Sequence, residues 1–88
     1  MKGILMFVQK GCPHCKRALK WHEVMFTKLH PEWVDIPLRI VDEEEEKALA
    51  DSYDYYYVPS YYIEGEKIHE GPVTQQDVER VFETAMKA

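Results

Sequence analysis

The sequence predicts an α/β fold in which strands and helices follow in the order βαβαββα, with a four-stranded mixed sheet flanked by helices. Three observations support this prediction: apolar runs of strand length, segments in which apolar residues recur at helical spacing, and a hairpin-like segment ahead of the last helix. The chain has 88 residues, of which 45% are hydrophobic. That is enough for a single hydrophobic core, so we expect one domain spanning residues 1–88.

The first half of the chain reads as strand, helix, strand. Residues 2–8 form an apolar run that ends at a Gln-Lys-Gly break, which fits a buried strand. From Cys15 to Leu29, apolar or small residues recur at helical spacing until Pro31 closes the segment. Residues 36–42 (IPLRIVD) then fit a second strand.

A second helix is expected to begin in the acidic run DEEEE. Asp42 and Glu45 have the spacing of a capping box, and acidic residues complement the positive end of a helix dipole. Asp54 is expected after the end of this helix, in the left-handed conformation. Four adjacent glutamates would point around a helix rather than toward one ion, so a solvated helix end is favoured over a cation site.

The last third of the chain reads as a hairpin followed by a helix. Strands are expected at residues 60–63 and 67–70, with a turn that contains Gly65 between them. Thr74 is a candidate N-cap, with Asp77 at the third helical position. The helix that follows has an apolar stripe, formed by Val78, Val81, Phe82 and Ala85.

Composition narrows the classes of partner. The net charge is −5, and the one local basic cluster is Lys16, Arg17 and Lys20, so nucleic acid is not expected as a partner. The N-terminal apolar run is too short for a signal peptide or a membrane span. We therefore expect a cytoplasmic monomer without a membrane partner, in a compartment that keeps thiols reduced.

Both cysteines of the chain lie in the sequence CPHC, between the first strand and the first helix. If Cys12 is the N-cap, Pro13 occupies the first helical position, where its missing N–H costs nothing. The backbone amides and dipole at a helix start stabilise a thiolate. Cys12 is therefore the expected nucleophile and Cys15 the resolving thiol. A protonated His14 would favour the thiolate further and raise the redox potential.

Other uses of two close cysteines need different surroundings. A structural zinc ion needs four ligands, and the side chains that could join the cysteines are His14, His22, His30 and His69. An iron–sulfur cluster shared by two chains would take thiolates from both copies. A structural disulfide would close so small a ring that it would constrain the unfolded chain little. Redox chemistry without a metal is favoured, and the metal and cluster alternatives stay open.

The sequence resembles the thioredoxin and glutaredoxin superfamily across nearly the whole chain. The resemblance is carried by CPHC after a first strand, by Val58-Pro59-Ser60 ahead of a hairpin, and by Gly71 before the last helix. It is closest to the small glutaredoxin-like thioredoxins. It implies the thioredoxin fold, with Cys12 and Cys15 as the redox pair and Pro59 as a cis-proline opposite them.

The sequence also departs from typical members of that superfamily. Gly11 stands where thioredoxins have a tryptophan before the motif. Glutaredoxins usually have Gly-Gly and an acidic or hydroxyl pair before the last helix, where this chain reads EGPVTQQD, and their lysine three residues before the first cysteine is Gln9 here. No organic cofactor is expected. The electron donor is either a reductase or glutathione as co-substrate.

All six tyrosines lie between residues 53 and 62. Strand propensity and core packing account for Tyr55 and for Tyr61 or Tyr62. Tyr57 differs, because it precedes the expected cis-proline by two residues and should lie near Cys12. We expect the substrate groove to be formed by Tyr57, Val58, Pro59, Ser60 and Gly71. The predicted function is a thiol–disulfide oxidoreductase that reduces protein or small-molecule disulfides.

Overall fold

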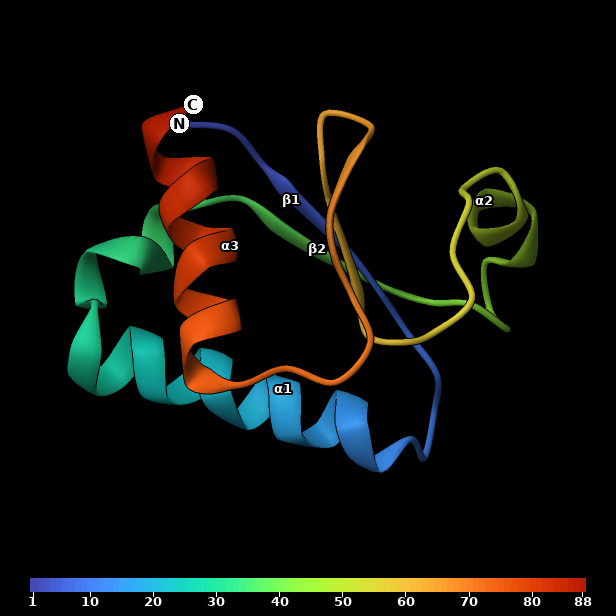
Figure 1. Ribbon diagram of the computed structural model, residues 1–88, viewed down its shortest axis with the longest axis horizontal. Coiled ribbons are helices and arrows are strands. Elements are labelled where there is room, and N and C mark those ends of the chain that lie inside the picture. The colour runs from blue at the N-terminus through green and yellow to red at the C-terminus, as the bar shows by residue number, and fades with distance from the viewer.

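The computed structural model describes all 88 residues, 1–88, and confirms the predicted order of elements (Figure 1). The elements are β1 (Ile4–Val8), α1 (Pro13–Val24), β2 (Leu38–Asp42), α2 (Lys47–Asp51), β3 (Ser60–Ile63), β4 (Glu66–Glu70) and α3 (Gln75–Lys87). A π-helical turn (Met25–Leu29) and a 3-10 turn (Pro31–Asp35) lie between α1 and β2. The two chain ends meet, where the Met1 amine donates to the Ala88 carbonyl at 2.8 Å.

The four strands form one mixed sheet in the order β2-β1-β3-β4. β1 runs parallel to β2, and β3 is antiparallel to both β1 and β4. The register pairs Phe7 with Ser60 and Val8 with Asp42. The ends of β1 and β2 and the start of β3 therefore share one edge of the sheet. The loop that carries the cysteines and the segment before β3 both leave the sheet at this edge.

Side chains alternate between two faces along β1. Ile4 and Met6 pack into the larger core with α1 and α3, while Phe7 packs with Ala50 of α2 on the other face. The chain thus forms three layers, with α1 and α3 together on one side of the sheet and the short α2 on the other. None of the helices has the length and apolar composition needed to cross a bilayer.

The first helix does not continue as a regular α-helix to Leu29. The Thr27 hydroxyl donates to the Glu23 carbonyl at 2.7 Å, and the His30 amide bonds the Met25 carbonyl five residues back at 2.7 Å. A side chain that competes for a helix carbonyl and a bond to the fifth preceding residue both widen the helix into a π-turn. The segment nevertheless stays helical up to Leu29, as predicted.

The second helix is shorter than predicted. Asp42 Oδ1 accepts from the amides of Glu44 at 2.8 Å and Glu45 at 3.3 Å, which fixes a turn rather than a helix start. α2 begins only at Lys47, after the like-charged glutamates. The prediction for Asp54 was also wrong, because Glu64 is the one non-glycine residue with a positive φ.

The third helix begins as predicted. Thr74 Oγ1 accepts from the Asp77 amide at 3.1 Å, and Asp77 Oδ2 accepts from the Thr74 amide at 2.9 Å. This is a complete capping box, and the hydrogen bond from the Thr74 amide is the main cause that holds the pKa of Asp77 below its usual value. The predicted apolar stripe of α3 is fully buried.

A histidine lies inside the larger core. His22 is 4% exposed, and its Nε2 is 2.8 Å from the hydroxyl of the buried Tyr61. Its Nδ1 has no hydrogen-bond partner. Burial lowers the pKa of His22 to about 4, because the charged ring would lose its hydration. His22 is therefore a neutral member of the core that joins α1 to β3.

His22 should make the protein sensitive to acid. Between pH 6.5 and pH 4 the unfolded chain binds a proton at this ring and the folded protein does not. The free energy of unfolding should therefore fall by up to about 3 kcal/mol over this range through His22 alone. Urea denaturation of the wild type and of His22→Gln measures this contribution. The difference in free energy of unfolding between the wild type and His22→Gln should change by about 3 kcal/mol between pH 7 and pH 4. Equal pH dependence of stability in the two proteins would contradict this role of His22.

Candidate active site

The cysteine pair lies at the start of α1. Cys12 is the N-cap with an extended backbone, Pro13 follows as the first helical residue, and the Lys16 amide donates to the Cys12 carbonyl at 3.1 Å. The Cys12 amide donates to the Gln9 carbonyl at 3.1 Å, which closes the turn that leaves β1. Gly11 within this turn has φ +82°, a conformation that glycine adopts without strain. The local sequence therefore places Cys12 where a helix begins.

The Cys12 thiol ionises more readily than an ordinary cysteine. Its partial burial acts to raise the pKa, but hydrogen bonding from the Cys15 amide, the Cys15 thiol and the His14 amide lowers it more. The net pKa of Cys12 lies below the usual value. The side chain makes no cap hydrogen bond of standard geometry, so the amides act mainly as dipoles directed at the sulfur.

Cys15 has the opposite character. It is 3% exposed and faces the core on the same stripe of α1 as Ala18 and His22. Burial is the main cause that raises the pKa of Cys15 to about 11, and the hydrogen bond to Cys12 adds to it. Both cysteines are free thiols. The pair thus combines one accessible, acidic thiol with one buried thiol that keeps its proton.

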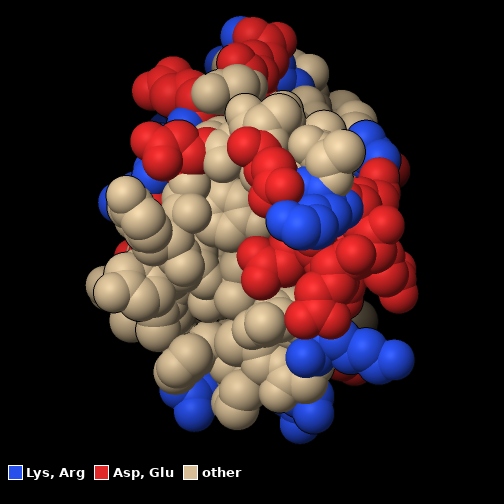
Figure 2. All heavy atoms as spheres, turned by 90° about the vertical axis from the view of Figure 1, so that its right-hand side faces the viewer, with Lys and Arg blue, Asp and Glu red and all other residues tan.

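Basic and acidic side chains lie on different sides of the cysteine pair. The chain has no acidic residue before Glu23, and Lys16 and Arg17 are exposed on α1 beside the cysteines. Acidic side chains gather on the face that carries α2, next to an uncharged area (Figure 2). The charge of Glu43 is a minor influence that acts to raise the pKa of both thiols, although the net pKa of Cys12 stays lowered. Glu43 therefore opposes the Cys12 thiolate, and the hydrogen bonds from the start of α1 outweigh it.

The two residues between the cysteines are both exposed. Pro13 fixes the first helical position, as predicted. His14 contributes its backbone amide to the lowered pKa of Cys12. An effect of the His14 imidazole stays a prediction, and solvent screens a charge on an exposed side chain.

The Val58-Pro59 peptide bond is cis, as predicted. Pro59 is buried, and its carbonyl accepts from the Gly71 amide at 2.8 Å, which ties the start of β3 to the end of β4. Gly71 has φ +94°, and a Cβ at this position would lie 3.9 Å from the Cβ of Tyr57. The register of β1 and β3 places these residues at the same edge of the sheet as the cysteine loop.

The predicted groove residues divide into exposed and buried groups. Tyr57 is exposed and Val58 half-buried, so both contribute surface at this edge. Ser60 is fully buried, and its hydroxyl donates to the Tyr57 carbonyl at 2.5 Å. Ser60 therefore shapes the loop from inside and does not line a groove. Sequence analysis missed Tyr56, which is more exposed than Tyr57.

The other tyrosines are mostly internal. Tyr61 and Tyr62 are both buried, one on each face of the sheet. Tyr55 stacks on Phe7 at 5.0 Å between ring centroids, and its hydroxyl donates to Glu43 Oε1 at 2.8 Å. The structure contains no group of three or more His, Cys, Asp or Glu side chains arranged to hold a metal ion.

Comparison with known proteins gives matches at the level of structure. No family model matches the sequence, and no curated protein matches it. The oxidised thioredoxin of Plasmodium falciparum is similar with a TM-score of 0.67 at 17% identity, over 92% of this chain and 77% of that one. A protein disulfide oxidoreductase from Aeropyrum pernix is similar with a TM-score of 0.66 at 23% identity, over 98% of this chain and 39% of that one.

These similarities show that the chain has the thioredoxin fold, as predicted from the sequence. This chain spans well under half the length of the Aeropyrum protein. The structural similarity extends over nearly all of this chain in both comparisons.

The two thiols should differ in reactivity. Iodoacetamide should alkylate Cys12 at neutral pH, where Cys15 should stay unmodified because its pKa is about 11 and it is buried. Mass spectrometry of digested protein distinguishes the two sites. Equal alkylation of both cysteines at pH 7 would contradict the assignment.

Two substitutions of Cys15 provide a matched control. Serine keeps a hydroxyl that can donate to the Cys12 sulfur, whereas alanine cannot. The pKa of Cys12, followed by thiolate absorbance, should therefore be higher in Cys15→Ala than in Cys15→Ser.

Proposed function

We propose that this protein is a thiol–disulfide oxidoreductase that uses Cys12 and Cys15 as a two-cysteine redox centre. The observation that carries the proposal is the contrast between the two thiols, because the pKa of Cys12 is lowered at a helix start and that of Cys15 is raised in the core. A nucleophile must ionise near neutral pH, and a resolving thiol must wait until an intermediate has formed.

The first step is attack on a substrate disulfide. The Cys12 thiolate attacks one sulfur of R–S–S–R′, the S–S bond breaks, and R′–S⁻ leaves with the electron pair. A mixed disulfide between Cys12 and R–S remains. The amides of His14 and Cys15, which lower the pKa of Cys12, support the thiolate before the attack. Lys16 and Arg17 lie exposed on the same helix and add positive charge nearby.

The second step releases the other half of the substrate. Cys15 gives up its proton and attacks the Cys12 sulfur, R–S⁻ leaves, and a Cys12–Cys15 disulfide forms. The negative charge of the Cys12 thiolate is one cause of the raised pKa of Cys15, and formation of the mixed disulfide removes it. Cys15 therefore becomes easier to ionise once the intermediate exists. The substrate gains two electrons from the cysteine pair, which becomes a disulfide, and the two released thiolates take up the proton lost by Cys15 and one from solvent.

An external thiol donor must return the protein to its dithiol form. Two donors fit the sequence: a reductase that accepts thioredoxin-like proteins, or glutathione as co-substrate. We propose that the protein works as a monomer in the cytoplasm, where such donors keep thiols reduced. Turnover with NADPH and thioredoxin reductase, compared with turnover with glutathione and its reductase, distinguishes the donors.

Substitution of each cysteine tests the mechanism. Cys12→Ser should lower the reduction of insulin disulfides by at least roughly 100-fold, because the nucleophile is lost. Cys15→Ser should accumulate a mixed disulfide with the substrate, which non-reducing electrophoresis and mass spectrometry detect. The assigned roles would be reversed if Cys12→Ser accumulated a mixed disulfide through Cys15 and Cys15→Ser accumulated none.

A further inference from the structure

Two aromatic residues are left in solvent beside the candidate redox centre. Tyr56 is 88% exposed and Tyr57 68% exposed. The other tyrosines of this segment are buried or half-buried. Exposed aromatic side chains side by side in sequence are unusual for a small domain and are typical of binding surfaces. We call Tyr56 and Tyr57 the aromatic pair.

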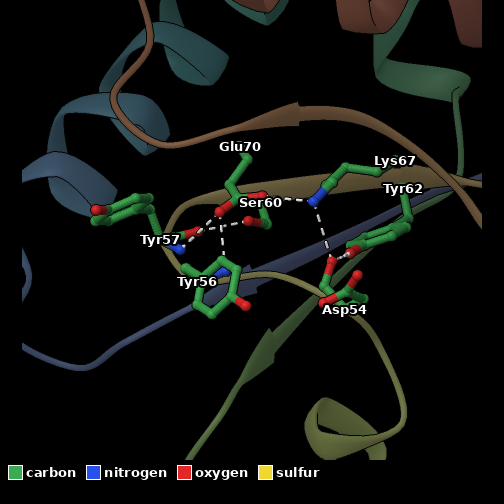
Figure 3. Close-up of polar contacts among 7 residues, drawn as sticks. All are labelled: Asp54, Tyr56, Tyr57, Ser60, Tyr62, Lys67 and Glu70. Carbon is green, nitrogen blue, oxygen red and sulfur yellow. Dashed lines mark hydrogen bonds and ion pairs between the residues drawn. The ribbon is translucent and has the colours of Figure 1, made fainter.

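The backbone of the aromatic pair is already hydrogen-bonded within the protein. Glu70 Oε2 accepts from the Tyr56 amide at 2.8 Å and from the Tyr57 amide at 3.0 Å. The Ser60 hydroxyl donates to the Tyr57 carbonyl. Figure 3 shows the bonds from the two amides converging on Glu70, with the two rings extending from the segment in different directions. These amides are therefore not available to a substrate, and the rings are the surface that the segment offers.

Glu70 is itself held in place. Its Oε1 is 2.6 Å from Lys67 Nζ, and the same ammonium group donates to the Asp54 carbonyl at 3.1 Å. The bond to Lys67, followed by the bond from the Tyr56 amide, lowers the pKa of Glu70 to about 2. The Tyr62 hydroxyl donates to the same Asp54 carbonyl at 2.6 Å (Figure 3). The carboxylate thus stays ionised and fixed between β4 and the segment before β3.

This cluster adjoins the redox edge of the sheet. Glu70 pairs with Ser60 in the ladder of β3 and β4. The next residue, Gly71, donates to the Pro59 carbonyl and lies close to the Cβ of Tyr57. The aromatic pair is therefore attached to the loop that carries the cis-proline, at the edge where Cys12 begins its helix.

We propose that Glu70 is a positioning residue that holds the aromatic pair as the substrate-recognition surface of the redox centre. The substrate class is then a polypeptide disulfide with an apolar or aromatic residue next to its cysteine. This inference rests on the proposed function, because it concerns the substrate that Cys12 attacks.

Two physical arguments favour this class. Tyrosine rings provide large apolar contact area and have few side-chain torsions to restrict on binding. A segment whose amides are fixed by Glu70 loses little further backbone freedom when a substrate binds, so the contact area contributes more fully to affinity. A small disulfide has no flanking side chain that could pack against the rings, so its reduction should gain nothing from Glu70.

Three disulfide substrates test the inference. Two are dimers of short single-cysteine peptides, identical except for Phe or Ser next to the cysteine, and the third is bis(2-hydroxyethyl) disulfide. The wild type should reduce the Phe peptide about five- to tenfold more efficiently than the Ser peptide, mainly through a lower KM. Glu70→Ala should abolish this preference and leave reduction of the small disulfide within twofold. Amide exchange at Tyr56 and Tyr57 should become at least tenfold faster in this variant.

Matched variants separate positioning from general damage. Glu66→Ala removes an exposed carboxylate from the same strand and should change neither the preference nor the exchange. Glu70→Gln keeps an oxygen that can accept from both amides and should retain most of the preference. Tyr56→Ser with Tyr57→Ser removes only exposed rings, so it should fold and should lose the preference even if Glu70→Ala does not fold.

The outcomes separate this inference from the proposed function. An unchanged preference in the double tyrosine variant, with the small disulfide still reduced, overturns the substrate inference alone. A Glu70→Ala variant that folds and keeps the preference overturns the positioning role. Failure of the wild type to reduce any of the three disulfides overturns the proposed function, and the inference with it.

Discussion

The pairing of β1 with both β2 and β3 is the constraint on which the rest of the structure depends. It brings the end of β1 and the start of β3 to one edge of the sheet, although Cys12 and Pro59 are far apart in sequence. Because β1 is central and buried, a shift of its register by one residue would exchange its two faces and move Met6 and Phe7 into the wrong cores. Core packing therefore fixes the position of the edge that carries the cysteine loop.

The same architecture explains how two thiols three residues apart acquire opposite properties. Cys12 lies at the N-cap, where the amides of His14 and Cys15 act on its sulfur, while Cys15 lies on the face of α1 that packs against the core. A single turn of helix separates a site that stabilises charge from a site that penalises it. No distant catalytic group is needed to create the contrast, since the helix start and the apolar core are both required for folding.

Features that depend on neighbouring residues could be predicted from the sequence, and those that depend on distant partners could not. The capping box of Thr74 and Asp77 and the helix start at Cys12 involve residues at most four apart, so their spacing was sufficient. The His22 bond to Tyr61 spans 39 positions and became visible only in the fold. The start of α2 was misplaced because Asp42 can cap either a helix or a turn, and the sequence does not separate these cases.

The tyrosine-rich segment shows how one distant contact redistributes residues of the same kind. Strand propensity treats all six tyrosines alike, and packing accounts for those that contact Phe7 or His22. Tyr56 and Tyr57 lie outside both cores, and Glu70 of β4 accepts hydrogen bonds from their amides ahead of Pro59. A carboxylate in a strand would normally be read as a solubilising surface residue. Here its position opposite Ser60 in the β3–β4 ladder lets it bind the backbone amides of the exposed Tyr56 and Tyr57, at the edge from which the cysteine loop leaves the sheet.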